Sequence, residues 1–164
     1  MYKILIVDDE KMIREGIKNG IPWKKLNIDT VLTAASGAEA VRLSKMHIDI
    51  LLTDISMEGM SGLELVTDIR KNCPDIRIVM MTAYDRFEYA QESLKLNVND
   101  FLLKPISEEE LAQALQCQID ILDDLAKKKK IQPIENVMEH TVLEWKFQQL
   151  IKNKLTPAEL EMLL

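Results

Sequence analysis

Five short apolar runs, separated by longer stretches with helical patterns, set the strongest limit on how this chain can fold. The runs are mostly apolar and do not strictly alternate with polar residues, which is typical of parallel strands buried on both faces. The alternation of strand and helix predicts an α/β fold with a doubly wound, five-stranded parallel sheet. The predicted strands are Lys3–Val7, Thr30–Ala34, Ile48–Thr53, Ile76–Thr82 and Val98–Leu103.

A short polar residue followed three positions later by glutamate opens four of the helical stretches. In this capping-box pattern the polar side chain accepts a hydrogen bond from a free helix N–H, and the glutamate reaches back. Four patterns in step with the gaps between strands support a repeating strand–helix order. The patterns are Ser36–Glu39, Ser61–Glu64, Asp85–Glu88 and Ser107–Glu110, and Pro74 ends the helix that begins near Ser61.

The helical pattern after Ser107 continues toward four lysines at 127–130. Two interpretations stay open: a covering helix that continues as a coiled coil, or one amphipathic helix with a frayed end. We predict a first domain at residues 1–125 and a helical linker, or the start of a further region, at 126–164. The apolar ending at Leu163 and Leu164 predicts a chain interrupted within a longer protein. The heptad-like positions are Leu111, Leu115, Leu122 and Leu125, with Gln118 in the seam.

The composition argues against several classes of function. With a net charge of -6, the chain repels nucleic-acid phosphates, so we expect no DNA binding by these residues. Cys73 and Cys117 belong to no CxxC or Cys/His cluster, which argues against zinc, redox and disulfide sites. No signal-peptide pattern is present and the apolar runs are too short to cross a bilayer, so we predict a soluble, cytoplasmic protein.

Polar side chains follow the ends of four predicted strands: Asp8 and Asp9, then Asp54, Thr82 and Lys104. Because the carboxyl ends of parallel strands lie at one edge of a sheet, these side chains are expected to lie close together. Three neighbouring carboxylates repel one another unless a cation joins them, and Mg²⁺ prefers such oxygen ligands.

Asp54 has the central position in this set and is the natural nucleophile. An aspartate carboxylate can form an acyl phosphate, while Lys104 and Thr82 supply a charge and a hydroxyl for the phosphoryl oxygens. A single strand-end aspartate is more commonly a turn former or helix cap. The combination at four strand ends is what predicts a phosphate site.

Four motifs resemble those of the receiver domains of two-component response regulators. The resemblance runs in order from Met1 to about Leu125 and implies a flavodoxin-like sheet with strand order 2-1-3-4-5. It also implies that a sensor histidine kinase phosphorylates Asp54 with Mg²⁺ as cofactor. The motifs are Ile6–Glu10, Thr53–Met57 with Gly59 and Gly62, Met81–Ala83, and Phe101–Pro105.

The resemblance also implies a role for each site residue. Asp9 would be a direct metal ligand, with Asp8 holding water, and Asp54 and the backbone carbonyl of Ser56 would complete the protein's share of the metal shell. Thr82 and Phe101 would move inward on phosphorylation, and the changed surface would form a homodimer or meet a partner. Ser56 and Tyr84 stand where the family tunes the lifetime of the phosphoryl group, and the Lys104–Pro105 peptide is typically cis.

The chain departs from the family pattern at two positions. Glu58 stands where the family often has proline, which is expected to loosen the loop beyond Asp54. Phe101 lacks the hydroxyl of the commoner tyrosine, so no phenolic hydrogen bond can hold its inward state. We also hypothesise that the bulk of Tyr84 hinders the attacking water and slows dephosphorylation.

The segments Ile21–Trp23 and Ala35–Ala40 are similar to response regulators of the AraC/YesN type, whose output is a helix-turn-helix domain. No basic recognition helix follows Gln132, so DNA binding is expected only through a missing C-terminal domain. One alternative is a stand-alone receiver that acts as a protein-interaction or phosphorelay module. Another is a hydrolytic enzyme, but Ser56 occupies the place where such enzymes need a second aspartate as acid or base. We therefore expect self-catalysed phosphorylation and dephosphorylation, not a turnover enzyme.

Overall fold

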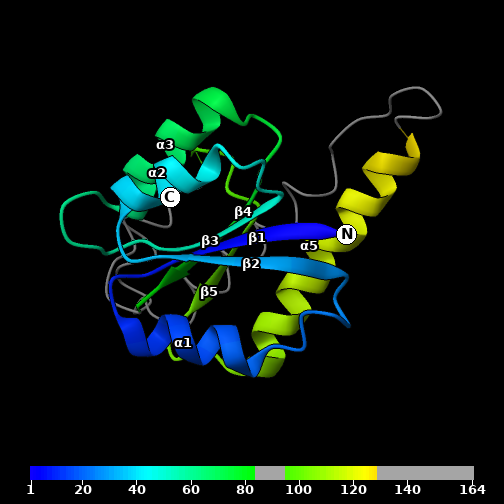
Figure 1. Ribbon diagram of the computed structural model, residues 1–164, viewed down its shortest axis with the longest axis horizontal. Coiled ribbons are helices and arrows are strands. Elements are labelled where there is room, and N and C mark those ends of the chain that lie inside the picture. The colour runs from blue at the N-terminus through cyan, green and yellow to red at the C-terminus, as the bar shows by residue number, and fades with distance from the viewer. Residues whose placement is uncertain (84–94, 129–164) are drawn as a thin grey trace, which may run out of the picture. The chain divides into compact units, whose positions relative to one another are not determined.

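The structure is a computed structural model that describes residues 1–83 and 95–128 (Figure 1). Met1–Gln132 form one compact unit of the chain. The predicted helix start at Asp85–Glu88 and the predicted region after residue 128 lie outside the described residues. The elements are β1 (Tyr2–Val7), α1 (Lys11–Gly20), β2 (Ile28–Ala34), α2 (Gly37–Ser44), β3 (Ile50–Asp54), α3 (Gly62–Asn72), β4 (Arg77–Thr82), β5 (Asp100–Leu103) and α5 (Glu108–Lys128).

The five strands form one parallel sheet in the order β2-β1-β3-β4-β5, which confirms the predicted fold and strand order. Some strand limits differ from those predicted. β2 begins at Ile28, two residues early, because Ile28 pairs with Tyr2 across a register shift. β3 runs through Asp54, which pairs with Met81, so the aspartate belongs to the strand itself.

Helices cover both faces of the sheet: α1 and α5 lie on one side, and α2 and α3 on the other (Figure 1). Alternate residues of β1, such as Ile4 and Ile6, pack on the α1/α5 side together with Leu115 and Ile119 of α5. All four are at most 2% exposed. Burial of side chains this large contributes roughly 1.5–3 kcal/mol each, so the core fixes the sheet edge that carries the polar residues.

Three of the predicted helix starts lie within the described residues, and all three are capped. Ser61 and Glu64 form a complete capping box at α3. At α2, the Ser36 hydroxyl accepts from the Glu39 N–H, while the Glu39 carboxylate accepts at 2.8 Å from the N–H of Ala35, the residue before Ser36. Ser107 accepts from the Glu110 N–H at 3.1 Å. The local sequence therefore specifies where these helices begin.

α5 covers the sheet with its first half. Gln118, predicted to lie in a coiled-coil seam, is instead buried and accepts two hydrogen bonds from the Arg77 guanidinium, at 3.0 and 2.8 Å. Farther along, Leu125 is 39% exposed. The covering role is thus established for the first half, and a coiled coil beyond it stays a prediction.

Among residues 1–83 and 95–128, no helix combines the length and the apolar character needed to span a bilayer.

Candidate functional site

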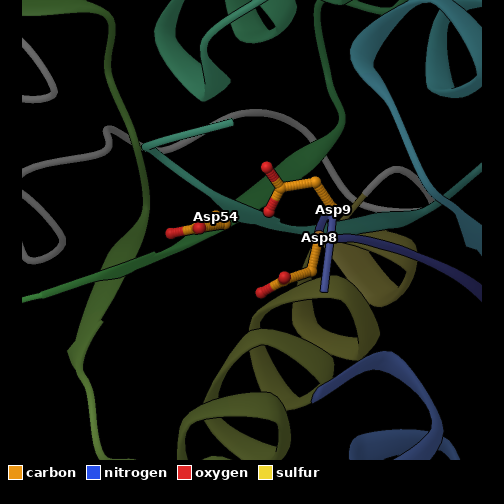
Figure 2. Close-up of side chains that lie close together, drawn as sticks. All are labelled: Asp8, Asp9 and Asp54. Carbon is orange, nitrogen blue, oxygen red and sulfur yellow. The ribbon is translucent and has the colours of Figure 1, made fainter. Parts of the chain in front are cut away.

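Three aspartates lie together at the carboxyl end of the sheet (Figure 2). Asp8 and Asp9 follow β1, and Asp54 ends the adjacent strand β3. One carboxylate oxygen from each lies within 4.8 Å of the others. Asp8 is fully buried and Asp54 is 6% exposed, whereas Asp9 faces solvent. The parallel topology therefore brings together side chains that are far apart in the sequence, as the strand-end pattern predicts.

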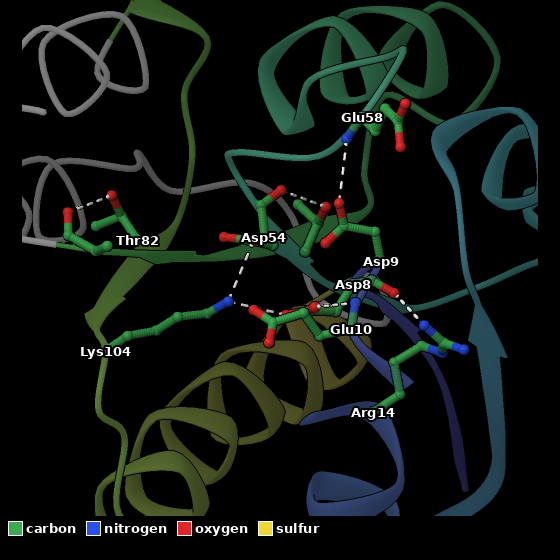
Figure 3. Close-up of polar contacts among 10 residues, drawn as sticks. Asp8, Asp9, Glu10, Arg14, Asp54, Glu58, Thr82 and Lys104 are labelled. Atoms are coloured by element: carbon green, nitrogen blue, oxygen red, sulfur yellow. Dashed lines mark hydrogen bonds and ion pairs between the residues drawn. The ribbon is translucent and has the colours of Figure 1, made fainter. Parts of the chain in front are cut away.

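Lys104 supplies a positive charge to this cluster (Figure 3). Its Nζ lies 2.9 Å from Oδ2 of Asp8 and 3.2 Å from Oδ2 of Asp54. The backbone N–H of Lys104 donates to the carbonyl of Thr82 at 2.8 Å, and the Lys104–Pro105 peptide is cis. The end of β5 thus directs the lysine side chain across β4 to the two carboxylates.

Burial and neighbouring charges shift the pKa values of Asp54 and Lys104. Burial raises the pKa of Asp54 above its ordinary value of 3.8, and the positive charge of Lys104 only partly opposes this shift. For Lys104, burial lowers the pKa, but the hydrogen bond to Asp8 and the charge of Asp54 outweigh it, so the pKa lies above 10.5. Lys104 therefore remains a cation at neutral pH, where it offsets part of the carboxylate charge.

Backbone contacts hold the turn after β1 in place. Oδ1 of Asp8 accepts from the Glu10 N–H at 2.8 Å, and the Arg14 guanidinium donates to the Asp8 carbonyl at 2.5 Å (Figure 3). Glu10, which precedes α1, makes no side-chain capping bond of its own. Arg14 was not among the residues predicted from the sequence; a basic residue one turn into a helix that follows an acidic turn is the signal that could have indicated it.

The loop between β3 and α3 packs directly on the backbone of Asp54. A Cβ atom built on Gly62 would lie 2.1 Å from the Asp54 carbonyl oxygen, so this position requires glycine. The Gly62 N–H donates to the Ile55 carbonyl at 2.8 Å. In the same loop, the Glu58 N–H donates to Oδ2 of Asp9 at 3.2 Å.

The remaining predicted site residues have different positions. Thr82, at the end of β4, is 7% exposed, and its hydroxyl donates to the carbonyl of Ala83 at 3.1 Å. Phe101 is buried in β5, and Ser56 is exposed in the loop after β3. Tyr84, predicted to tune phosphoryl lifetime, lies outside the described residues. The structure thus joins the aspartates with Lys104, while the Thr82 hydroxyl is engaged by neighbouring backbone.

The chain is similar to known response regulators in sequence and in fold. Residues 4–116 match the response regulator receiver domain family. A solved structure, the REC domain of AraT, a response regulator from Geobacillus stearothermophilus, superposes with a TM-score of 0.72 at 38% sequence identity. That match covers 76% of this chain and 98% of the AraT chain. The chain therefore belongs to the receiver domain family of two-component response regulators, which confirms the resemblance seen in its motifs.

Two longer relatives carry the name of transcriptional regulatory proteins. The chain is 32% identical to the uncharacterized transcriptional regulatory protein YesN of Bacillus subtilis over 145 residues, which is 85% of this chain and 39% of YesN. It is 38% identical to the transcriptional regulatory protein HptR of Staphylococcus aureus over 112 residues, which is 68% of this chain and 44% of HptR. The chain thus spans less than half the length of either relative.

Replacing Asp54 with asparagine is expected to stabilise the cation-free domain at pH 7 by about 1 kcal/mol. The folded state raises the pKa of this carboxyl, so its protonated form stabilises the fold below pH 3.8. This stabilisation is lost as the pH rises through the pKa of Asp54 in the folded state. The gain should therefore shrink as the pH falls toward 3.8. Urea unfolding in chelator across this pH range measures the effect, with exposed Asp68→Asn as the control. An Asp54→Asn variant less stable than the wild type at pH 7 would contradict the prediction.

Proposed function

We propose that Asp54 accepts a phosphoryl group from a sensor histidine kinase in a Mg²⁺-dependent reaction. The observation that carries this proposal is the joint position of the Asp54 carboxylate, the Lys104 ammonium and two further aspartates at one sheet edge. A nearly buried carboxylate with a cation beside it is a suitable nucleophile for an anionic phosphoryl group. The family match to receiver domains agrees with this chemistry.

In the proposed reaction, a carboxylate oxygen of Asp54 attacks the phosphorus of a phosphohistidine. The new O–P bond gives an acyl phosphate, while the P–N bond breaks and its electron pair leaves with the imidazole nitrogen. Lys104, already 3.2 Å from Asp54, is placed to neutralise charge on the phosphoryl oxygens. The Thr82 hydroxyl must leave the carbonyl of Ala83 before it can contact the phosphoryl group.

The donor set fits a hard divalent cation. Carboxylate oxygens of Asp8, Asp9 and Asp54 lie within 4.8 Å of one another, and exposed Asp9 leaves the cluster open to solvent ions. We assign these residues, with the backbone carbonyl of Ser56, to Mg²⁺. When bound, Mg²⁺ neutralises phosphoryl charge during the transfer.

We propose a phosphorylation switch and not a turnover enzyme, because Ser56 stands where hydrolytic relatives need a second aspartate. Phosphorylation would favour an active surface, with Thr82 and Phe101 moving together, and would promote a homodimer. The names of YesN and HptR favour transcription as the output, through a DNA-binding domain beyond these residues. We propose the cytoplasm as the site of action.

Incubation with acetyl phosphate and Mg²⁺, followed by intact-mass measurement, tests the proposal. The wild type is expected to gain one phosphoryl group, and Asp54→Ala none, because the nucleophile is gone. Asp68→Ala, which removes an exposed carboxylate on α3, should still be phosphorylated. No adduct on the wild type, or an undiminished adduct on Asp54→Ala, would overturn the proposal. Light scattering on the same samples tests phosphorylation-dependent dimerisation.

A further inference from the structure

We propose that the backbone N–H of Glu58 is a positioning group for the metal site, because it holds the carboxylate of Asp9 where a divalent cation can bind. The inference rests on the proposed function only in taking these aspartates as cation ligands. Its basis is the hydrogen bond from the Glu58 N–H to Oδ2 of Asp9, at 3.2 Å (Figure 3). This bond joins the loop after β3 to the turn after β1.

Asp9 differs from the other two aspartates in what holds it. Asp8 is fully buried; its Oδ1 accepts a hydrogen bond from the Glu10 N–H, and its Oδ2 accepts one from the Lys104 ammonium. Asp54 is 6% exposed and also contacts Lys104. Asp9 is exposed, and among the described residues its carboxylate is held by the Glu58 N–H. The position of the Asp9 carboxylate therefore depends on this one loop.

Charge repulsion gives the bond its importance. Two carboxylates within 4.8 Å would push an exposed and rotatable third one toward solvent. The directional bond to Glu58 opposes that movement, and it occupies Oδ2 while Oδ1 remains available to a cation. Hydrogen bonds that orient carboxylate ligands commonly change metal affinity by about 10-fold to 100-fold when removed.

Two substitutions of Glu58 carry the same charge and differ in whether the backbone N–H is present. Proline has no backbone N–H, and it is the residue that the family often has at this place. Glu58→Pro therefore removes both the donor and the carboxylate side chain. Glu58→Ala removes the same side chain and keeps the donor, so the difference between the two variants reports on the N–H.

Binding of Mn²⁺ to the unphosphorylated protein is the readout, with free Mn²⁺ measured by electron paramagnetic resonance. Glu58→Ala is expected to bind about twofold more weakly than the wild type, because one nearby negative charge is lost. Glu58→Pro is expected to bind about tenfold more weakly than Glu58→Ala. Equal affinities of the proline and alanine variants would overturn the inference.

The same pair in an Asp9→Ala background separates the specific bond from a general effect of proline on the loop. With no carboxylate to position, the proline and alanine variants should differ less than about twofold. A tenfold difference that persists without Asp9 would overturn the inference. Phosphorylation of Asp54 by acetyl phosphate, measured on the same proteins, tests the proposed function separately. A normal adduct together with equal Mn²⁺ affinities would overturn only the role of Glu58.

Hydrogen exchange supplies a test that does not require Glu58→Pro to fold. In cation-free protein, Asp9→Ala is expected to speed exchange of the Glu58 amide about fivefold, because its acceptor is lost. The amide of Gly59, in the same loop, should change much less. Equal exchange of the Glu58 amide with and without Asp9 would overturn the inference.

Discussion

Replacing Gly62 with alanine is expected to lower the free energy of unfolding by about 3 kcal/mol or more. The added Cβ would lie 2.1 Å from the carbonyl oxygen of Asp54 and 3.0 Å from the Ile55 Cα. Both neighbours are backbone atoms, so no side-chain rotation can relieve the overlap. The loop or the end of β3 must move, and the movement displaces the candidate phosphoacceptor. Urea denaturation monitored by circular dichroism measures the loss.

Gly16 provides the matched control for this prediction. It lies within α1, and a Cβ atom there would meet nothing within 4 Å. Gly16→Ala is therefore expected to stabilise the domain by up to about 1 kcal/mol, because alanine favours the helix more than glycine. A Gly62→Ala variant as stable as Gly16→Ala would show that the loop yields easily, and would contradict the tight contact beneath Asp54.

Replacing Lys104 with methionine is expected to cost the cation-free domain about 2 kcal/mol at pH 7. Lys104 is the cation that contacts fully buried Asp8 and nearly buried Asp54. Loss of one partner of a buried ion pair typically costs about 3–5 kcal/mol. We expect a smaller loss here because Lys104 is partly exposed and because the Glu10 N–H still donates to Asp8 in the variant. Urea denaturation in chelator measures the effect, and added Mg²⁺ should restore part of the stability.

The pH dependence of the Lys104→Met variant gives a second check. The folded state raises the pKa of Lys104. The contribution of its positive charge to the free energy of unfolding is therefore fully present below pH 10.5, and it is lost as the pH rises through the pKa of Lys104 in the folded state. The wild type and the variant should therefore approach each other in strongly alkaline solution. Lys71→Met, at an exposed pair with Asp68, should change stability by at most about 0.5 kcal/mol. A loss for Lys104→Met no larger than this control would contradict the prediction.

The strand-end residues show why so much of the site could be predicted from sequence. Asp8, Asp54 and Lys104 each come directly after an apolar run, and parallel pairing brings the ends of such runs to one edge of the sheet. This inference needs the strand order but no side-chain geometry. The capping pair Ser61 and Glu64 was predictable for a similar reason, because its two hydrogen bonds are local.

The contacts that were not predicted from the sequence depend on backbone groups or on distant packing. Arg14 donates to the backbone carbonyl of Asp8, and although its place one turn into α1 points to the acidic turn, the residue type does not say which carbonyl it contacts. Gln118 fits a heptad seam in the sequence, yet it pairs with Arg77, 41 residues away, because α5 turns that side toward β4. Only the packing of the helix on the sheet distinguishes these two positions.

The sequence by itself determined the parallel α/β fold, the strand order through its family motifs, and the set of charged residues at one sheet edge. It could do so because periodicity, helix caps and strand ends are local properties of the chain. Only the tertiary structure decided how the acidic site is held: Lys104 on two carboxylates, Gly62 against the carbonyl of Asp54, and the Glu58 N–H on Asp9. Those contacts join segments that meet only in the folded chain, and their distances follow from the packing of loops on the finished sheet.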